Sequence, residues 1–357
     1  MMKFQRSPME TSQRLKQFLA KIKDLKKIPL IRACNQFPKL FTMGQLLILP
    51  LVLLVLGCSS CQQQQPAAQT AVTATTMEQA SQELIHRILP DYADRFIVES
   101  MAKDSGRDAF ELETKGDKIV LRGNDGVSIA SAFNYWLNNY AHCSVSWNSN
   151  NLDIPKPFPL ISSKVHKVSP HKYRYYFNYT TYTLIWWDWE RWQKEIDWMA
   201  LHGINLPLAV QGQNVVWDKV YKDLGFTKAD MDKFFTGPSW FIWFWMGNMD
   251  GWGGPLPKSW MDGHEKLEKQ ILARERSLGM KPVLQGFTGH VPANFKQHFP
   301  NAKLRKTNWE GRFADTYILD PTDSMFTVIG KLFMQEQIKT YGTDHYYAAD
   351  VFNEMVP

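Results

Sequence analysis

The strongest candidate for proton-transfer chemistry in this sequence is Glu354, which follows Asn353 in the segment DVFNEMVP at residues 350–357. The apolar residues before it, DHYYAADVFNE, read as a buried strand, so the glutamate stands at a strand end. A carboxylic acid held in a partly desolvated site can protonate a leaving oxygen and then act as a base on water. This pair of residues therefore predicts an acid/base site.

Other catalytic chemistries have no support in the sequence. The nine histidines are scattered without HExxH spacing, and no CxxC pair is accompanied by a second pair or a histidine cluster. The chain has neither a GxSxG nor a GxxxxGK[ST] motif, and GWGGPLP at residues 251–257 is a turn cluster and not a dinucleotide loop. We therefore expect no metal and no cofactor.

The basic residues are concentrated at the start of the chain. The formal net charge of +6 arises because residues 1–39 hold ten Lys or Arg against Glu10 and Asp24, whereas the remaining residues carry 31 basic and 33 acidic side chains. The folded part is thus slightly acidic. A nucleic-acid partner is excluded on this ground, since the positive charge belongs to a leader and not to a face of the folded body.

The segment LLILPLVLLVLG at residues 46–57 is typical of the apolar part of a signal peptide, being short for a membrane-spanning helix. Gly57 and Cys58 loosely match a bacterial lipoprotein cleavage box, so Cys58 would carry lipid and anchor the exported protein at the bacterial envelope. Residues 1–58 are then a basic leader and signal, and residues 59–76 are a disordered tether. Ordinary secretion is the alternative. Cys58 and Cys61 lie outside the folded body, and the four cysteines make no disulfide framework.

The organisation of the rest of the chain changes once. Residues 77–160 read as a helix, strands and a second helix, a small α/β domain ending in the proline-rich stretch 153–164, read as a linker. Residues 170–357 alternate between strands and helices, which favours a parallel sheet with right-handed crossovers. Either a doubly wound sheet or a (β/α)8 barrel would fit this alternation.

Two features favour the barrel. The first is that polar and aromatic residues gather directly after the predicted strands, where a barrel builds its active site. These residues are 178–182, 211–214, 288–290, and Asn353 with Glu354. The second is that 11 of the 14 tryptophans fall between Trp186 and Trp260, and flat aromatic faces are used against sugar rings.

The tryptophans divide into two sets by their spacing. Trp189, Trp192, Ile196 and Met199 follow a helical period, which predicts that they pack a helix onto the sheet. Three further tryptophans lack such a period and are predicted to lie in a long loop, where ligand contact and core packing are about equally expected. They are Trp243, Trp245 and Trp252.

Several segments together resemble the α-N-acetylglucosaminidase family, glycoside hydrolase family 89. The resemblance runs from about Asp91 to the end of the chain and depends on five segments that occur in the same order. They are WWDWERWQKEIDWMALHGINLPLA, FFTGP, MGNMDGWGGPLP, GHVP and GTDHYYAADVFNEM. The order of several independent motifs makes the resemblance specific.

The resemblance implies a retaining exo-glycosidase that removes terminal α-linked N-acetylglucosamine, with one glutamate as acid/base and a second, on a later strand, as nucleophile. Glu354 matches the acid/base. Six residues match substrate-binding positions or stand in matching motifs: Asn353, Asn178, His290, Trp243, Asn248 and Trp252. The sequence departs from the pattern at Thr180, where relatives often have cysteine beside the pocket.

The second carboxylate is missing from the sequence pattern. Retention needs two carboxyl groups about 5–5.5 Å apart, whereas Asp350 on the same strand would lie roughly 13 Å from Glu354 at ~3.3 Å per residue. Substrate assistance would typically place an acidic residue beside the acid, where Asn353 stands.

A complete barrel takes about 250 residues, and residues 170–357 supply 188 residues and about four strands. We therefore expect an α/β fold, a small N-terminal α/β domain followed by the first half of a (β/α)8 TIM-type barrel. Such a truncated form should hydrolyse little or nothing alone. A non-catalytic carbohydrate-binding remnant at the envelope is the alternative, and a product that never folds is a third.

Overall fold

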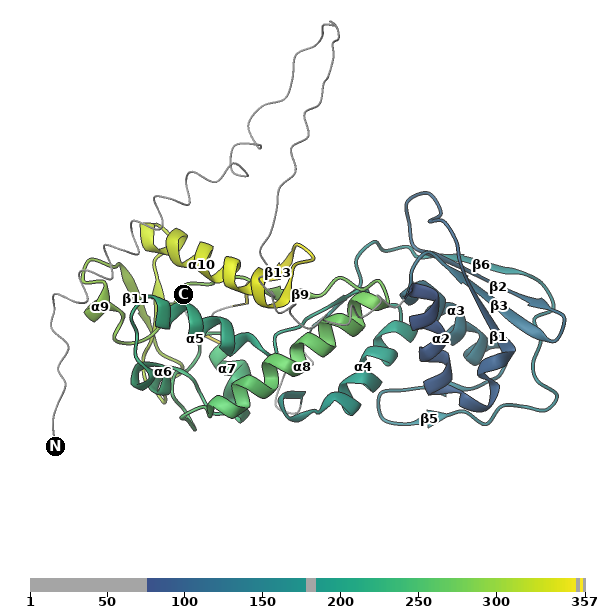
Figure 1. The fold of residues 1–357 in the computed structure, drawn as a ribbon, viewed down its shortest axis with the longest axis horizontal. Helices are drawn as coiled ribbons and strands as arrows, with labels where there is room; N and C mark the ends of the chain where they lie inside the picture. The colour runs from purple at the N-terminus through teal and green to yellow at the C-terminus, as the bar shows by residue number, and fades with distance from the viewer. Residues whose placement is uncertain (1–75, 178–183, 351–353, 356–357) are drawn as a thin grey trace, which may run out of the picture. The chain divides into compact units, whose positions relative to one another are not determined.

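A four-stranded sheet and two helices form the small domain near the start of the folded part. The computed structural model describes residues 76–177, 184–350 and 354–355 (Figure 1). The strands stand in the order β1-β3-β2-β6, with β1 parallel to β3 and the other pairs antiparallel. Its elements are α2 (Met77–Ile88), η2 (Pro90–Arg95), β1 (Phe96–Ser100), β2 (Ala109–Lys115), β3 (Lys118–Gly123), α3 (Gly126–Asn139) and β6 (Val165–Val168).

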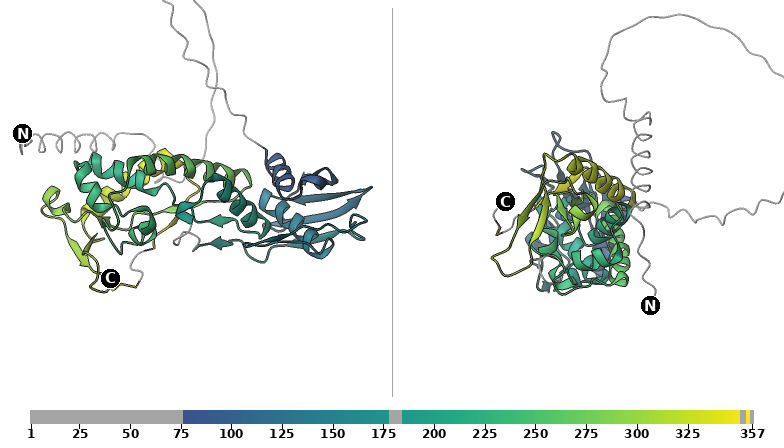
Figure 2. Two further views of the ribbon diagram at one scale, coloured as in Figure 1. Left: turned by 90° about the horizontal axis from the view of Figure 1, so that it is seen from below. Right: turned by 90° about the vertical axis from the view of Figure 1, so that its left-hand side faces the viewer.

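Local signals in the sequence set these boundaries. Thr76 caps α2 by accepting a hydrogen bond from the backbone N–H of Gln79 (3.2 Å), and Asp125 caps α3 by accepting one from Ser128 (2.7 Å). Gly116 takes a φ of 65° in the turn between β2 and β3, a conformation that glycine adopts without strain. Helix α2 lies on one face of the sheet, as Figure 1 and the left view of Figure 2 show.

The proline-rich stretch 153–164 packs onto the small domain and is not a free linker. Phe158 stacks on the buried Trp136 with ring centroids 5.0 Å apart, and Trp136 Nε1 donates to the carbonyl of Pro159 (3.0 Å). The backbone of Ile161 exchanges two hydrogen bonds with the hydroxyl of Thr114 on β2. A proline has no backbone N–H, so a proline-rich stretch has fewer donors that must be paired when it packs over a core.

A short hairpin precedes that stretch. It is formed by β4 (Ser144–Val145) and β5 (Asn150–Asn151), which pair antiparallel. The side chains from Ser146 to Asn151 are exposed.

Four parallel strands form the sheet of the second part, as the alternating pattern predicted. Pairing joins Tyr175 to Leu206, Leu208 to Val283, and Val283 to Tyr346, which fixes the order β7-β8-β9-β13. The strands are β7 (Tyr175–Tyr176), β8 (Leu206–Pro207), β9 (Val283–Gln285) and β13 (Tyr346–Ala348). The helices between them are α4 (Trp189–Leu201), α5 (Gln213–Asp223), α8 (Lys258–Ser277) and α10 (Ser324–Tyr341).

The core packing predicted from helical spacing is confirmed for three of the four residues, whereas Trp189 is half-buried. Trp192, Ile196 and Met199 on α4 are all fully buried, and Trp187 packs edge-to-face on Trp192. A buried amide relay ties two other helices to the sheet: Gln337 on α10 accepts from Gln213 on α5 (2.8 Å) and donates to the β9 carbonyl of Gln285 (2.8 Å).

Two insertions interrupt the alternation and were not predicted from the sequence as such. The first, after α5, holds α6 (Lys228–Phe234), η4 (Pro238–Trp240) and α7 (Phe241–Trp245). The second, after β9, is an antiparallel sheet in the order β10-β12-β11 with a short helix. It consists of β10 (His290–Val291), α9 (Phe295–His298), β11 (Leu304–Thr307) and β12 (Thr316–Leu319).

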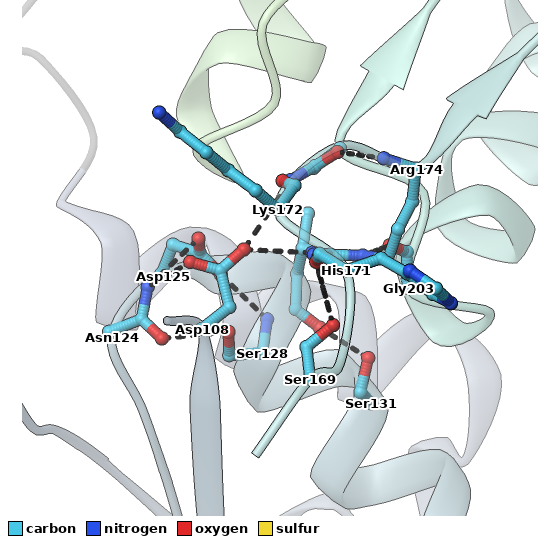
Figure 3. Close-up of polar contacts among 12 residues, drawn as sticks. Asp108, Asn124, Asp125, Ser128, Ser131, Ser169, His171, Lys172, Arg174 and Gly203 are labelled. Atoms are coloured by element: carbon cyan, nitrogen blue, oxygen red, sulfur yellow. Dashed lines mark hydrogen bonds and ion pairs between the residues drawn. The ribbon is translucent and has the colours of Figure 1, made fainter. Parts of the chain in front are cut away.

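A polar contact joins the small domain to the first barrel strand (Figure 3). The carboxylate of Asp108 accepts hydrogen bonds from Arg174 (2.9 Å), Lys103 (2.7 Å) and Asn124 (3.1 Å). Arg174 also donates to the carbonyls of His171 (2.8 Å) and Gly203. The start of β7 is therefore fixed on the small domain by one guanidinium group.

Within the ranges that the structure describes, no helix is both long enough and apolar enough to cross a membrane. Cys58, the predicted lipidation site, lies outside the described residues.

Candidate active site

The candidate site lies at the edge where β9 and β13 end side by side. The backbone N–H of Gly286 donates to the carbonyl of Ala348 (2.7 Å), so the segments that follow the two strands leave the sheet together. One leads to His290 and the other to Glu354. Parallel strands place their carboxyl ends at one edge of the sheet. The segments that carry Glu354, the predicted acid, and His290, a predicted sugar contact, therefore both begin at this edge.

Glu354 itself stands in a turn with its side chain exposed. Its φ is 56°, in the left-handed region that few residues other than glycine adopt, and such backbone conformations are concentrated at functional sites. Asn353 and Asn178, and also Thr180, lie outside the described residues.

His290 is buried and held by one carboxylate. It is 1% exposed, its Nε2 lies 2.7 Å from Oδ1 of Asp250, and the rings of Phe234 and Phe244 pack on it with centroids 4.8 and 5.0 Å away. Burial raises the pKa of Asp250, and the interaction with His290 opposes that rise.

The ionised carboxylate only accepts hydrogen bonds, so the His290–Asp250 contact favours the proton on Nε2 of the imidazole. Nδ1 is then an acceptor, and it has no hydrogen-bond partner among the described residues. A buried acceptor without a partner is costly, and it suits a hydroxyl donor supplied from outside the protein.

Aromatic rings from the two insertions form a continuous run. Trp243 stacks on Trp309 (centroids 4.8 Å, 28°), Trp309 stacks on Phe313 (5.0 Å, 16°), and Phe313 meets Trp252 edge-on (5.0 Å). Trp243 is 9% exposed and Trp252 is 47% exposed, so the run leads from the interior to the surface. Its exposed end offers an aromatic face to a ring-shaped ligand.

The expectation that the second tryptophan set lies in a loop is wrong for two of its members. Trp243 and Trp245 are on helix α7 and are buried, whereas Trp252 lies in the loop after it. The error has a physical reason: α7 has five residues, all apolar, and a helix buried on all sides shows no amphipathic period.

Asn248 is placed by the turn after α7. Its side chain is fully buried, and its backbone N–H donates to the carbonyl of Trp243 (2.8 Å). The preceding Gly247 has a φ of 79°, and its carbonyl accepts from the hydroxyl of Thr316 on β12 (2.9 Å). The antiparallel sheet therefore supports the turn that carries Asn248.

Sequence reasoning missed two residues of this arrangement. Asp250 lies between Asn248 and Trp252 in the segment MGNMDGW, and a carboxylate inside a glycine-bounded turn next to predicted site residues could have drawn attention to it. Trp309 lies about 60 residues further along the chain, in the turn between β11 and β12, and only the fold brings it to Trp243. No local pattern could have found Trp309.

A cavity of about 440 Å³ lies on the parallel sheet. Tyr175, Phe177, Tyr347 and Asp350 line it, with parts of β8, β9 and β13. Burial raises the pKa of Asp350, and it raises the pKa of Tyr175 to about 12, with a further contribution from the charge of Asp350. Asp350 faces this cavity from the end of β13.

Comparison with known proteins follows the two parts of the fold. The family model described as "Alpha-N-acetylglucosaminidase (NAGLU) tim-barrel domain" matches residues 174–357, and that of the corresponding N-terminal domain matches residues 79–160. Human alpha-N-acetylglucosaminidase is 42% identical over 289 residues, which are 78% of this chain and 39% of that protein. The chain thus spans about two fifths of the length of the curated relative that it matches.

Solved structures give the same result. A family 89 glycoside hydrolase from Clostridium perfringens, in complex with 2-acetamido-1,2-dideoxynojirmycin, is 33% identical with a TM-score of 0.74, covering 80% of this chain and 34% of that one. A variant of the Clostridium perfringens enzyme with two glutamates changed to glutamine, in complex with its substrate GlcNAc-alpha-1,4-galactose, also has a TM-score of 0.74 at 33% identity, covering 78% and 33%.

Proposed function

The chain belongs to the α-N-acetylglucosaminidase family, a family of glycoside hydrolases, and from that premise we propose that it takes part in removing terminal α-linked N-acetylglucosamine from glycans. The observation that carries the proposal is that β9 and β13 end side by side, with the segment to His290 following one strand and the segment to Glu354 following the other. This is the edge at which a barrel enzyme places its catalytic groups.

Glu354 is the proposed general acid and base. It would protonate the glycosidic oxygen as the bond to the leaving group breaks, and then take a proton from the attacking water. Asn353 and Asn178 are proposed to bind sugar hydroxyl groups, and Asn248 is proposed to contact the sugar from the turn after α7.

His290 and the aromatic run complete the proposed sugar site. Nδ1 of His290 would accept a sugar hydroxyl, with Asp250 holding the ring by its other nitrogen. Trp243 and Trp252 are proposed to contact the apolar faces of the sugars, supported by Trp309 and Phe313.

The proposed mechanism retains the anomeric configuration and needs a second carboxylate as nucleophile about 5–5.5 Å from the first. Asp350 is the closest acidic residue in sequence, four residues before Glu354, and it lines the cavity on the parallel sheet. The Clostridium perfringens relative was captured with its substrate after two glutamates had been changed. We infer that the 357 residues supply one glutamate of the pair and that they hydrolyse glycosides only slowly by themselves.

Azide provides a direct test of this assignment. In a retaining glycosidase without its nucleophile, a small anion can attack the sugar from the vacant face, while the acid still protonates the leaving group. We expect the 357-residue chain to release 4-nitrophenol slowly from its α-N-acetylglucosaminide. With an aryl glycoside of poorer leaving ability, added azide should yield the β-glycosyl azide, and Glu354→Gln should abolish that product.

The outcomes separate the candidate functions. Formation of the azide product that depends on Glu354 supports the acid role. Rapid turnover without azide, lost in Glu354→Gln, would contradict the inference that one carboxylate is missing. Binding of N-acetylglucosamine without any turnover, with or without azide, would favour the alternative function of a carbohydrate-binding protein.

Export with a lipid anchor is proposed from the segment before the folded part. The apolar residues 46–57 directly precede Cys58, and a glutamine- and threonine-rich stretch follows. Incorporation of labelled palmitate in a bacterial host should be lost in Cys58→Ala and kept in Cys61→Ala, a matched cysteine three residues away. Labelling that persists in Cys58→Ala would refute the anchor.

A further inference from the structure

A second cavity, of about 500 Å³, lies between the β4–β5 hairpin and helix α4, away from the candidate active site. We propose that it binds an uncharged saccharide. Its walls come from residues 145–150 of the hairpin, residues 190–198 on α4, and Arg87 with Ile88 at the end of α2. The volume falls in the range of small-molecule sites.

Trp147 forms a fixed aromatic wall of this cavity. Its Nε1 donates to both carboxylate oxygens of Glu195 (2.9 and 3.1 Å), and that carboxylate also accepts from Arg191 (3.0 Å) and from the hydroxyl of Tyr176 (3.3 Å). The side chain of Glu195 is fully buried, so the hydrogen bond holds the indole by its inner edge. The ring nevertheless remains 47% exposed.

An indole held in this way is suited to one kind of ligand. The faces of a pyranose ring carry C–H bonds, which pack favourably against the electron-rich face of an aromatic ring. Since the ring is already immobilised by Glu195, ligand binding would cost little side-chain conformational entropy at Trp147.

The ionic side chains of the wall cancel one another. Three cations and three anions line the cavity, and each cation has an anionic partner. The pairs are Arg87 with Asp197 (2.7 Å), Arg191 with Glu195 (3.0 Å) and Lys194 with Glu190 (3.0 Å). A sulfated or phosphorylated ligand would find no unpaired cation in this wall, and an uncharged ligand pays no charge-desolvation cost.

Amide groups supply the polar part of the site. The side chains of Asn148, Asn150 and Gln193 line the cavity and make no hydrogen bond to another residue of the described part of the chain. An amide both donates and accepts, which matches hydroxyl and acetamido groups. An aromatic face, paired charges and amides together suit an uncharged sugar better than an anion.

Fluorine NMR of the chain labelled with 5-fluorotryptophan tests this proposal residue by residue. Of the 14 tryptophans, Trp147 and Trp252 are equally exposed at 47%, so each serves as a control for the other. Their signals are assigned by their loss in Trp147→Phe and Trp252→Phe. Titration with N-acetylglucosamine should shift the Trp147 signal to saturation with a Kd of about 1–10 mM, a weak affinity typical of a single small contact site.

Substitutions on the hairpin then locate the ligand. The double variant Asn148→Ala, Asn150→Ala should raise the Kd reported by Trp147 about fivefold or more, whereas Asn151→Ala, on the same hairpin but outside the cavity wall, should leave it unchanged. N-acetylglucosamine 6-sulfate should bind no more tightly than the uncharged sugar at low salt.

Each other outcome overturns the proposal. If the Trp147 signal does not move while that of Trp252 does, sugar binding is confined to the candidate active site and the proposed function stands without this one. If neither signal moves, both the second saccharide site and the proposed function lose support. Tighter binding of the sulfated sugar, weakened by salt, would instead indicate an anion site.

Discussion

Asp108 binds two cations that differ in exposure and in their other contacts, which allows a comparison at the scale of single residues. Burial alone would raise the pKa of Asp108, but the hydrogen bonds from Lys103 and Arg174 outweigh it and hold the pKa below its usual value. The side chain of Arg174 is 18% exposed and that of Lys103 is 53% exposed.

Removing the half-buried cation, Arg174, should destabilise the fold much more than removing the exposed one, Lys103. We expect Arg174→Met to lower the free energy of unfolding by about 2–4 kcal/mol, because it removes one donor from the buried carboxylate, one from the carbonyl of His171 and the side-chain donor to the carbonyl of Gly203. Lys103→Met should cost less than about 1 kcal/mol. Urea unfolding of both variants measures the difference, and equal losses would show that burial does not decide the strength of these ion pairs.

The same contact has a pH signature. Because the folded pKa of Asp108 is lowered, its contribution to stability is complete above the unfolded pKa of about 3.9 and is lost as the pH falls through the folded value. In Arg174→Met this acid-side loss should be smaller, which unfolding curves between about pH 5 and pH 3 would reveal.

His290 is the second residue whose state is set by one partner. We expect its imidazole to carry a proton on Nε2, facing the carboxylate, and Asp250→Ala to give a mixture of tautomers, since the carboxylate that only accepts has been removed. Nitrogen-15 NMR of the nine histidines distinguishes the two ring nitrogens. An unchanged His290 spectrum in the variant would show that Asp250 does not select the tautomer.

For single residues, the sequence predicts roles that follow from local spacing, but it does not predict contacts between residues that are distant along the chain. The spacing of Trp192, Ile196 and Met199 was enough to place them in the core. The stacking of Trp309 on Trp243 depends on an antiparallel sheet inserted after β9, so no feature near either residue could have indicated it.

Helix α8 is the element with the most unusual charge distribution. It buries Glu268 and Glu275 on one face, two turns apart. Burial raises the pKa of Glu268 to about 8, although the backbone N–H of Gln211 donates to it (3.1 Å). Burial also raises the pKa of Glu275, and the charge of Glu268 adds to the effect. Neither carboxyl oxygen of Glu275 has a hydrogen-bond partner in the part of the chain that the structure describes.

These raised pKa values predict that the fold loses stability as the pH rises. Between about pH 4.3 and pH 8 the folded chain keeps protons that the unfolded chain has released, so the free energy of unfolding falls across this window. Glu275→Met should stabilise the protein by about 1–3 kcal/mol at pH 8 and flatten the decline, because a methionine fills the space without a charge.

The matched control for that helix is Glu265→Met, which removes a carboxylate paired with Lys269 at the helix surface (2.5 Å). It should change stability by less than about 0.5 kcal/mol. Thermal unfolding of the native chain and of both variants at pH 6 and pH 8 gives the change in the free energy of unfolding that each substitution causes at each pH. A Glu275→Met variant that is less stable than the native chain at pH 8 would show that Glu275 has a partner that compensates its burial.

At the scale of elements, the strands that alternate with helices were predictable and the inserted strands were not. The alternation of strands and helices indicated the four parallel strands and the helices α4, α5, α8 and α10. The strands β10, β11 and β12 form an antiparallel sheet between β9 and α10, which departs from that alternation. Tertiary pairing decides their structure.

The parallel sheet determines how whole molecules should behave in solution. Within the described residues β7 pairs only with β8, and β13 pairs only with β9, so both outer edges have unpaired backbone groups. The side chains of Tyr175 and Tyr347 beside these edges are 46% and 36% exposed. Exposed edges with apolar neighbours favour association.

We therefore expect the 357-residue chain to self-associate at micromolar concentration, and Tyr175→Lys to reduce this because a charge on an edge strand opposes pairing. Trp186→Lys is the control, since Trp186 is 54% exposed and lies outside the sheet. Sedimentation velocity over a range of concentrations measures both. A monomer at all concentrations, or an equal effect of the two variants, would contradict a role for the open edges.

The last strand of the small domain has a consequence for the order of events during synthesis. Strand β6 is the fourth strand of that sheet and pairs with β2, so the sheet can be completed only after residue 168 has left the ribosome. Arg174, which docks on Asp108, follows six residues later. The small domain thus finishes folding just as the first barrel strand emerges, and it offers the nascent barrel a completed template on which to begin.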